Sequence, residues 1–166
     1  MSVLSFKALS VNDNFKYYQL LQQVSANENG FHNEMFGKSH SGYFKWLQLS
    51  VDEKVGKNLR PGYVPRSTYW LLNDDGIPVG IGRIKHQLTP AMKKNSGHIA
   101  YAIGRPFRGQ GYGSKLCQLL IDECRKMGIN PIQVTVEFAN EASNRIVRQA
   151  GGRVVGQTDT MTIYQI

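Results

Sequence analysis

The chain has 166 residues, 41% of them hydrophobic and 19% charged, and its formal net charge is +8. This composition is typical of one soluble globular domain, long enough to bury roughly 70% of its unfolded surface. It argues against a membrane-spanning chain, because no apolar run approaches the about 18 to 20 residues that a helix needs to cross a bilayer. The N-terminus also lacks the basic and apolar regions of a secretory signal, so we expect a cytoplasmic protein with a single domain over residues 1–166.

The N-terminal part of the chain predicts a strand followed by two helices. Residues 3–9 alternate in hydrophobicity, as in a strand with one buried face. Asn12 or Asp13 can cap the next helix, because a short side-chain oxygen satisfies the free N–H groups of a first turn. Residues 27–30 indicate a turn, and a second helix is expected over 43–55. The apolar stripes expected to face the core are Phe15, Tyr18, Leu20, Leu21 and Val24, then Phe44, Leu47, Val51 and Val55.

The middle of the chain predicts an antiparallel hairpin and a central strand. Residues 66–72 and 77–86 indicate two strands, joined at 73–76 by Asn-Asp-Asp-Gly, a strong hairpin turn. The central strand covers 98–103, where β-branched and aromatic residues suit a buried, pleated surface.

The C-terminal part predicts an alternation of helices and strands. A helix over 114–127 precedes a strand over 132–138, and this order gives a right-handed crossover. A helix over 140–150 and a last pair of strands, 153–156 and 161–166, complete the chain. We expect a mixed α/β (α+β) domain with one continuous, mostly antiparallel twisted sheet flanked by helices.

A basic, glycine-rich turn joins the central strand to its helix, and it reads Arg-Gly-Gln-Gly-Tyr-Gly from Arg108 to Gly113. The N–H groups at the start of a helix have no partner within it, and the helix dipole adds about half a positive charge there. Gly111 and Gly113 have no Cβ to hold an anion away. Because Arg105 and Lys115 add full charges, the turn is predicted to bind a phosphate or pyrophosphate.

The spacing within this turn excludes two common phosphate motifs. A P-loop ends in Gly-Lys-Ser/Thr, but here Ser114 precedes Lys115. The dinucleotide fingerprint Gly-x-Gly-x-x-Gly fails because the glycines fall at 109, 111 and 113. The pattern that fits, Arg/Gln-x-x-Gly-x-Gly/Ala between a strand and a helix, resembles motif A of the GCN5-related N-acetyltransferases (GNAT).

The resemblance extends over most of the chain. Asn140-Glu-Ala-Ser-Asn144, before a helix that ends in Gly-Gly, looks like motif B of the family. The segments 62–70 and 97–101 are similar to a bacterial branch of acetyltransferases.

The family resemblance implies acetyl-CoA as cosubstrate and no metal. It implies that the central strand splays from its neighbour after Ile103, that the pantetheine arm pairs with the backbone of Ala102 to Arg105, and that the Ile103 N–H stabilises the developing oxyanion. The cofactor-binding residues that it implies are Ala102, Ile103, Gly104, Arg105, Arg108, Gly109, Gln110, Gly111, Tyr112, Gly113, Ser114, Asn140 and Asn144.

Attack by an amine needs a base, because a lysine-like ammonium has a pKa near about 10.4. His98 and Glu137 are the candidates, acting directly or through water. Each also has a structural interpretation: a histidine bonded to backbone at a strand end, and a solvated strand end. Many family members carry a general-acid tyrosine seven residues after the first motif B asparagine, where this chain has Val147. Tyr101, Tyr112 and Tyr164 are alternatives, and the acid is unassigned.

The basic residues are scattered along the sequence, and no Cys/His metal signature or RNA-binding aromatic motif is present. We interpret the charge as promoting solubility and attracting a polyanionic cofactor, with nucleic-acid binding as the alternative.

The two cysteines, Cys117 and Cys124, lie seven residues apart on one predicted helix. Their Cα atoms would be about 10 Å apart, beyond the about 7 Å limit for a disulfide, so we expect buried thiols in a reducing compartment.

The sequence therefore predicts an acetyl-CoA-dependent N-acetyltransferase that moves the acetyl group to a primary amine by direct attack in a ternary complex. The acceptor, a small-molecule or peptide amine, is not identified, and a homodimer is common in the family. No nucleic-acid or membrane partner is expected. The alternative of another class is a CoA-binding sensor or structural protein with little catalysis.

Overall fold

The computed structural model describes residues 3–28 and 30–166. Asn29, within the predicted turn at 27–30, lies outside the described residues. In chain order the main elements are β1 (Ser5–Ala8), α1 (Phe15–Leu21), β2 (Asn27–Glu28), β3 (Phe31–His32), α2 (Tyr43–Lys54), β4 (Arg66–Leu72), β5 (Pro78–Lys85), β6 (Ile99–Ile103), α3 (Tyr112–Lys126), β7 (Gln133–Glu137), α4 (Glu141–Gln149), β8 (Arg153–Gln157) and β9 (Met161–Gln165).

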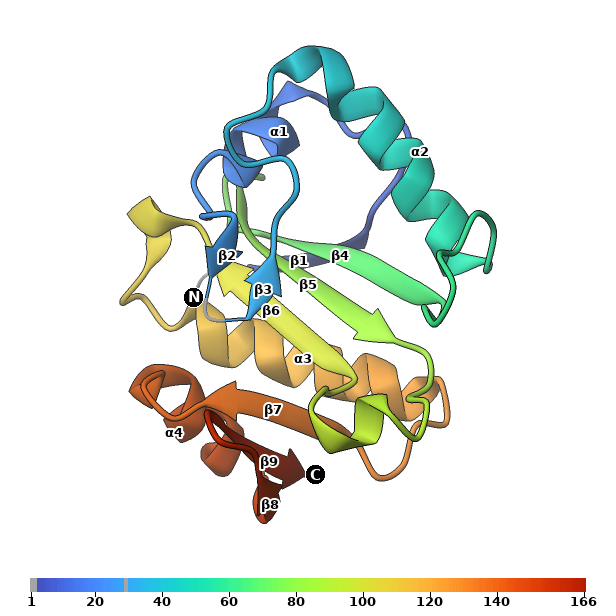
Figure 1. The fold of residues 1–166 in the computed structure, drawn as a ribbon. Coiled ribbons are helices and arrows are strands. Elements are labelled where there is room, and N and C mark those ends of the chain that lie inside the picture. The colour runs from blue at the N-terminus through green and yellow to red at the C-terminus, as the bar shows by residue number, and fades with distance from the viewer. Residues whose placement is uncertain (1–2, 29) are drawn as a thin grey trace.

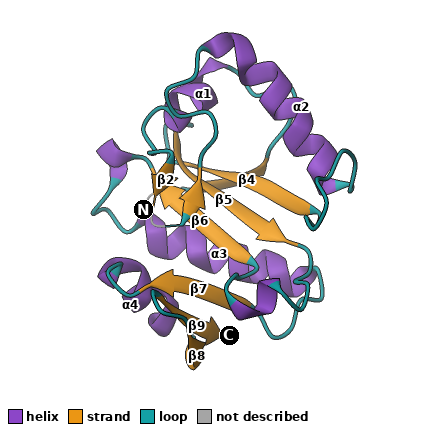
Figure 2. Cartoon of the chain, in the orientation of Figure 1, coloured by secondary structure: helices purple, strands orange, loops and turns teal. Residues whose placement is uncertain are grey.

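The strands form antiparallel sheets rather than the one continuous sheet expected (Figures 1 and 2). One sheet has the order β1-β4-β5-β6, a second has the order β7-β9-β8, and β2 and β3 form a small hairpin. The expectation of one sheet was wrong because β6 and β7 do not pair along their length. The mixed α/β character, the antiparallel pairing and the splayed central pair are confirmed.

The two larger sheets meet at one end of β6 and β7. The His98 N–H donates to the Gln133 carbonyl over 2.7 Å. Gly97 permits this approach, because a Cβ at that position would lie 2.7 Å from the Gln133 oxygen. From Ile99 onward the strands pair with other partners, so the divergence begins before Ile103, the point that the resemblance implied.

Helices cover both faces of the β1-β4-β5-β6 sheet (Figure 1). Residues of α1 and α2 share one core cluster with Trp70 and Ile81, whereas α3 lies in the other cluster with Leu71 and Val79. The alternation of side chains along β4 and β5 therefore serves two separate cores.

Helix α3 lies close against β5 because two glycines of that strand have no side chains. A Cβ on Gly82 would lie 2.7 Å from Leu120 Cδ1, and a Cβ on Gly80 would lie 3.0 Å from Leu116 Cδ2. These glycines let Leu116 and Leu120 become fully buried.

The predicted cap and stripe of α1 need correction. Asn14, rather than Asn12 or Asp13, caps the helix by accepting the Lys16 N–H over 3.1 Å. Asp13 is buried and accepts a hydrogen bond from the Trp70 indole over 2.8 Å. Phe15 is exposed, and the buried face of α1 carries Tyr17, Leu20 and Leu21, with Tyr17 packed against Trp70.

In α2 the buried face is also rotated from the predicted stripe. Phe44 and Val55 are exposed, whereas Tyr43, Trp46 and Leu47 are buried. Aromatic packing against the sheet decides this rotation, since the rings of Trp46 and Trp70 of β4 have centroids 6.2 Å apart.

The C-terminal elements agree with the predicted order, and their ends differ by one or two residues. Cys117 and Cys124 are buried free thiols, as expected, and burial raises the pKa of Cys117 to about 11. Within the described ranges, no helix combines the length and the apolar character needed to cross a membrane.

Candidate active site

A cleft of about 800 Å³ opens where β6 and β7 diverge. Its walls are β6, β7 and the start of α4, and the β2–β3 hairpin lies over one side. The glycine-rich turn before α3 contributes Arg108, Gly109 and Gly111 to its lining. The divergence of the two strands thus creates this opening beside the turn that was predicted to bind phosphate.

The edge of β6 that faces away from β5 offers its backbone groups to this cleft. Gly104 donates to the Val79 carbonyl, and His98 accepts from the Lys85 N–H. Because alternate residues of an antiparallel strand face the partner, Ala100 and Ala102 also point their backbone groups toward β5. The N–H and C=O groups of Ile99, Tyr101 and Ile103 therefore point toward the cleft.

The turn presents a run of backbone donors. Among the described residues, no hydrogen bond is recorded for the N–H groups from Gly109 to Ser114, and the first bond of α3 runs from Lys115 N–H to Gly111 O. Gly109 and Gly111 have φ of 75° and 84°, which favour glycine, and a Cβ at either would meet no atom within 4 Å. These free donors at a helix start suit an anion such as pyrophosphate.

Gly113 has a packing role. A Cβ there would lie 3.2 Å from Ile146 Cδ1, so this glycine lets α3 approach α4. From the sequence, Gly111 and Gly113 were expected to leave room for an anion. In the structure, the open space lies at Gly109 and Gly111.

Arg108 connects the turn to the hairpin. Its guanidinium forms an ion pair with Glu28 and donates from Nε to the Ile103 carbonyl over 3.2 Å. Burial tends to raise the pKa of Glu28, but hydrogen bonds from Ser25 and the Arg108 charge together lower it below its ordinary value. The Glu28 carboxylate is therefore ionised and holds Arg108 beside the cleft.

The model of the acetyltransferase (GNAT) family matches residues 29–151. The chain belongs to the GNAT acetyltransferase family. This membership confirms the predicted acyltransferase class. A comparison with curated proteins finds no match.

Solved structures share the GNAT fold at low sequence identity. The ribosomal alpha-N-protein acetyltransferase RimL in complex with coenzyme A aligns with a TM-score of 0.72 and 18% identity, over 98% of this chain and 93% of that one. An acetyltransferase from Salmonella typhimurium that modifies an N-terminal serine of a ribosomal protein aligns with a TM-score of 0.66 and 18% identity, over 98% and 94%. A spermidine N-acetyltransferase chimera from Vibrio cholerae and hSSAT gives 0.66 and 13%, over 98% and 94%.

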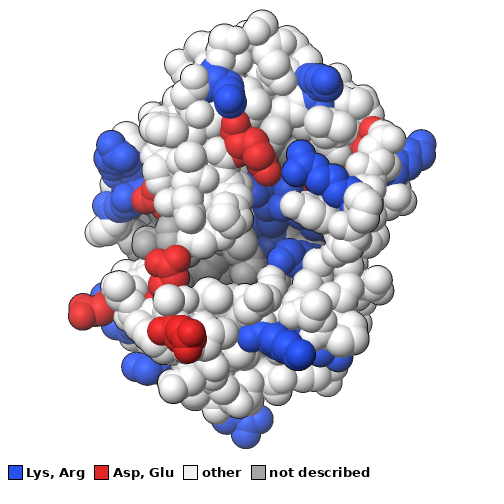
Figure 3. Space-filling model, viewed as in Figure 1, with Lys and Arg blue, Asp and Glu red and all other residues white. Residues whose placement is uncertain are grey.

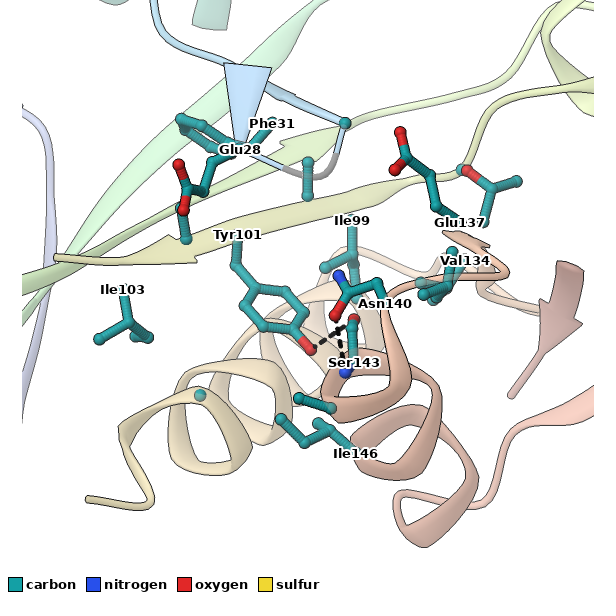
Figure 4. Close-up of a pocket in the computed structure, with 18 of the residues that line it drawn as sticks. Glu28, Phe31, Ile99, Tyr101, Ile103, Val134, Glu137, Asn140, Ser143 and Ile146 are labelled. Atoms are coloured by element: carbon teal, nitrogen blue, oxygen red, sulfur yellow. Dashed lines mark hydrogen bonds between the residues drawn. The ribbon is translucent and has the colours of Figure 1, made fainter. Parts of the chain in front are cut away.

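In this GNAT chain, α4 brings a hydroxyl group to the cleft. Ser143 Oγ lies 3.1 Å from the Tyr101 hydroxyl, and both residues line the cleft (Figure 4). Burial, together with the nearby Cys117, holds the pKa of Tyr101 well above its ordinary value. Val147, at the position where many GNAT members have a tyrosine, is fully buried.

The two motif B asparagines of this GNAT chain have different surroundings. Asn140 lines the cleft and caps α4 by accepting the Ser143 N–H over 3.2 Å. Asn144 donates to the carbonyls of Glu137 and Asn140 and accepts from the Tyr164 hydroxyl over 2.6 Å. Both amide hydrogens of Asn144 are used, so this side chain joins β7, α4 and β9 and has no donor left for a cofactor.

The two predicted bases lie on opposite walls. His98 Nδ1 accepts the Gln133 N–H over 3.0 Å, which places the proton of the neutral ring on Nε2. Burial and the charges of Lys85 and Lys93 lower the pKa of His98. Glu137 lies on β7, and its carboxylate points away from the Tyr101–Ser143 pair in Figure 4.

The cleft brings together most of the predicted site residues. Those that line it are His98, Ala102, Ile103, Arg108, Gly109, Gly111, Tyr112, Gly113, Ser114, Glu137 and Asn140. Gly104, Arg105, Gln110 and Asn144 do not line it. The Arg105 N–H donates to the Gln23 carbonyl and the Gly104 N–H to Val79, so the expected pairing with the whole segment 102–105 is not available.

The sequence reasoning missed several residues of the cleft, and Ser143 had a usable signal because it lies within motif B. Glu28 had none, because the hairpin that carries it is far from the turn in sequence. In the part of the chain that the structure describes, His, Cys, Asp and Glu side chains form no group of three or more that could hold a metal ion.

Proposed function

We propose that this protein is an acetyl-CoA-dependent N-acetyltransferase that transfers an acetyl group to a primary amine by direct attack in a ternary complex. The observation that carries the proposal is the run of free N–H groups from Gly109 to Ser114, next to an unpaired strand edge in one cleft. When bound, acetyl-CoA supplies an activated acyl group as a thioester. The residues present fit that cosubstrate.

The main chain would hold the cosubstrate. The N–H groups of the turn would bind the pyrophosphate, aided by the α3 dipole. The outward backbone groups of Tyr101 would pair with an amide group of the pantetheine arm as another strand does. The Ile103 N–H would donate to the negative charge that develops on the carbonyl oxygen, a contribution of about 3 kcal/mol in comparable sites.

Glu137 is the base in this proposal. Its carboxylate can accept a proton from the ammonium of the acceptor, directly or through water. His98 is less suited, because one ring nitrogen bears the proton and the other accepts the Gln133 N–H. His98 is therefore assigned to joining the two sheets.

Ser143 is the proposed hydrogen-bond donor that stabilises the departing thiolate. Its hydroxyl lies in the cleft, and Tyr101 fixes its position through their mutual hydrogen bond. The pair offers a hydroxyl from α4, the same helix that carries the tyrosine in many family members, although Val147 occupies the usual position.

A binding experiment with a matched control tests the phosphate site. Gly111→Asp should weaken acetyl-CoA binding at least about tenfold in titration calorimetry, because a carboxylate beside the phosphates repels them. Gly62→Asp is the control, since Gly62 has φ 82° and open space like Gly111 but does not line the cleft. Equal losses in both variants, or no binding by the natural protein, would overturn the proposal.

Thiol release from acetyl-CoA, measured over a panel of amines, amino acids and peptides with free N-termini, tests turnover. Release with at least one acceptor supports the enzyme. Tight binding without release from any of them would favour the alternative, a CoA-binding sensor.

A further inference from the structure

The end of the cleft near His98 carries a group of cationic side chains, Arg66, Arg83 and Lys85. Arg66 lies directly opposite Lys85 in the β4–β5 register, and Arg83 is two residues before Lys85 on the same face. All three line the cleft. Figure 3 shows a hollow at the centre of one face, with Lys and Arg side chains on its wall and acidic side chains beside them.

The charges in this group do not balance. Arg66 forms ion pairs with Glu53 and Glu34, and Arg83 pairs with Glu34 over 3.3 Å. Within the described residues, the Lys85 ammonium donates a hydrogen bond to the Ser96 hydroxyl over 2.5 Å and to no carboxylate. Three cations therefore share two carboxylates, and the charge of Lys85 is uncompensated.

Arg83 also has an unused donor. Its side chain is almost fully buried, and within the described residues its buried Nε has no hydrogen-bond partner. A buried donor without a partner is costly, and it needs an explanation. Burial and the neighbouring Arg66 lower the pKa of Arg83 to about 10. Burial, with Arg66, likewise lowers the pKa of Lys85.

A purely structural ion-pair cluster would match its charges and satisfy its donors. Arg66 with Glu53 fits that description, since Nε and Oε2 are 2.8 Å apart. Lys85 and Arg83 do not, and both face the cleft that also contains the Glu137 carboxylate. Positive charge at Lys85 and Arg83, together with a base at Glu137, suits a substrate that carries both an anionic group and an amine.

We propose that Lys85 and Arg83 bind a carboxylate of the acceptor, so that the preferred substrates are amines that carry an acidic group. This inference rests on the proposed function, because it places the amine in the same cleft. Lys85 and Arg83 are specificity residues that contact the acceptor away from its reacting nitrogen. The carboxylate can belong to a free amino acid or to an acidic residue of a peptide.

The experiment compares acceptors that differ only in the carboxylate. One arm uses free amino acids and their amides, and the other uses dipeptide amides with aspartate or asparagine in the second position. In the preferred arm, we expect kcat/KM to be about 10- to 100-fold higher for the acceptor with the carboxylate than for its amide. An effect of this size is what a charge-assisted hydrogen bond provides. The arm that shows the preference identifies the source of the carboxylate.

Variants of Lys85 test whether this residue causes the preference for acceptors with a carboxylate. Lys85→Gln should remove most of the preference while changing kcat/KM for the amide less than about threefold, and Lys85→Glu should reverse it. Lys94→Gln is the control, because Lys94 is exposed and does not line the cleft. A structural role alone would lower kcat/KM equally for both acceptors.

The two proposals fail in different ways. If thiol release occurs but the amide is used as well as the acid, or if Lys85→Gln keeps the preference, the carboxylate site is wrong and the acetyltransferase stands. If acetyl-CoA binds and no amine in either arm releases thiol, the proposed function is wrong and the carboxylate site falls with it.

Discussion

The backbone N–H of Gln133 donates to Nδ1 of His98 over 3.0 Å, while the His98 N–H donates to the Gln133 carbonyl over 2.7 Å. This reciprocal pair joins the two larger sheets at the point where β6 and β7 begin to diverge. His98 therefore uses its acceptor nitrogen for architecture.

This pair predicts different effects for two substitutions of His98. Asparagine keeps an acceptor for the Gln133 N–H, so His98→Asn should retain kcat/KM within about tenfold, with an unchanged pH profile. His98→Ala leaves that N–H unpaired and should cost about 1 to 3 kcal/mol of unfolding free energy in urea. Loss of the low-pH limb of the pH–rate profile in both variants would instead make His98 the base.

The burial of His98, with the charges of Lys85 and Lys93 near it, predicts how stability depends on pH. The folded-state pKa of His98 is lowered from 6.5, so the unfolded chain binds its proton more tightly. The His98 contribution to stability is therefore present above the unfolded pKa and decreases as pH falls below about 6.5. His98→Asn should flatten the change in Tm between about pH 7 and pH 5; an unaltered slope would contradict the assigned cause.

Glu137 is predicted to be needed for transfer and dispensable for cosubstrate binding. Glu137→Gln removes the proton acceptor, so kcat should fall about 100-fold or more. Calorimetric titration should show acetyl-CoA affinity within about threefold of the natural protein. Glu141→Gln, an exposed carboxylate at the start of α4, is the matched control and should leave kcat unchanged. Equal losses in both would remove the role from Glu137.

The Ser143 hydroxyl is predicted to assist departure of the thiolate. Ser143→Ala should lower kcat about tenfold or more, whereas Ser143→Thr keeps the hydroxyl and should recover most of the rate. Steady-state thiol release measures both. A Ser143→Ala enzyme with full kcat would show that the thiolate leaves without this donor.

Glu28 is predicted to restrain Arg108. Glu28→Gln removes the ion pair, so Arg108 becomes available to the phosphates and acetyl-CoA should bind about three- to tenfold more tightly.

Because the folded pKa of Glu28 lies below 4.5, its stabilisation is present above that pH and is lost as pH falls through the folded value. The variant should therefore lose less stability on acidification. Asp74→Asn, in the exposed β4–β5 turn, should change neither property, and weaker binding by Glu28→Gln would contradict the restraint.

The glycines of β5 are predicted to be intolerant of a single methyl group. Gly82→Ala should cost about 1 to 3 kcal/mol in urea unfolding, because its Cβ would lie 2.7 Å from Leu120. Gly42→Ala, where a Cβ meets nothing within 4 Å, should be neutral or slightly stabilising. A stable Gly82→Ala protein would mean that α3 shifts without cost.

The parts of the fold and site predicted from the sequence are those determined locally. The turn from Arg108 to Gly113 and the helix predicted over 140–150 follow from short patterns with specific backbone requirements. The split of the sheet was not predictable from strand patterns, because it depends on which edge of β6 remains unpaired. Glu28, Arg83 and Lys85 come from other parts of the sequence, and only the packing of the hairpin and sheet brings them to the cleft.

The sequence also did not predict which face of each helix is buried. Periodicity predicted α2, yet the buried face contains Tyr43 and Trp46 in place of Phe44 and Val55. Leu, Val and Phe all suit either orientation, and contacts with Trp70 decide between them.

The groups that the turn and the free edge of β6 direct at the cleft are peptide groups, which every residue except proline supplies in full. Selection at these positions therefore acts on backbone shape more than on side-chain identity. A saturation scan should find that Ile103, whose side chain packs against the core, accepts other apolar side chains, whereas Gly109 and Gly111 tolerate almost none. Much of the recognition proposed for this protein would consequently be invisible to a search for characteristic side chains.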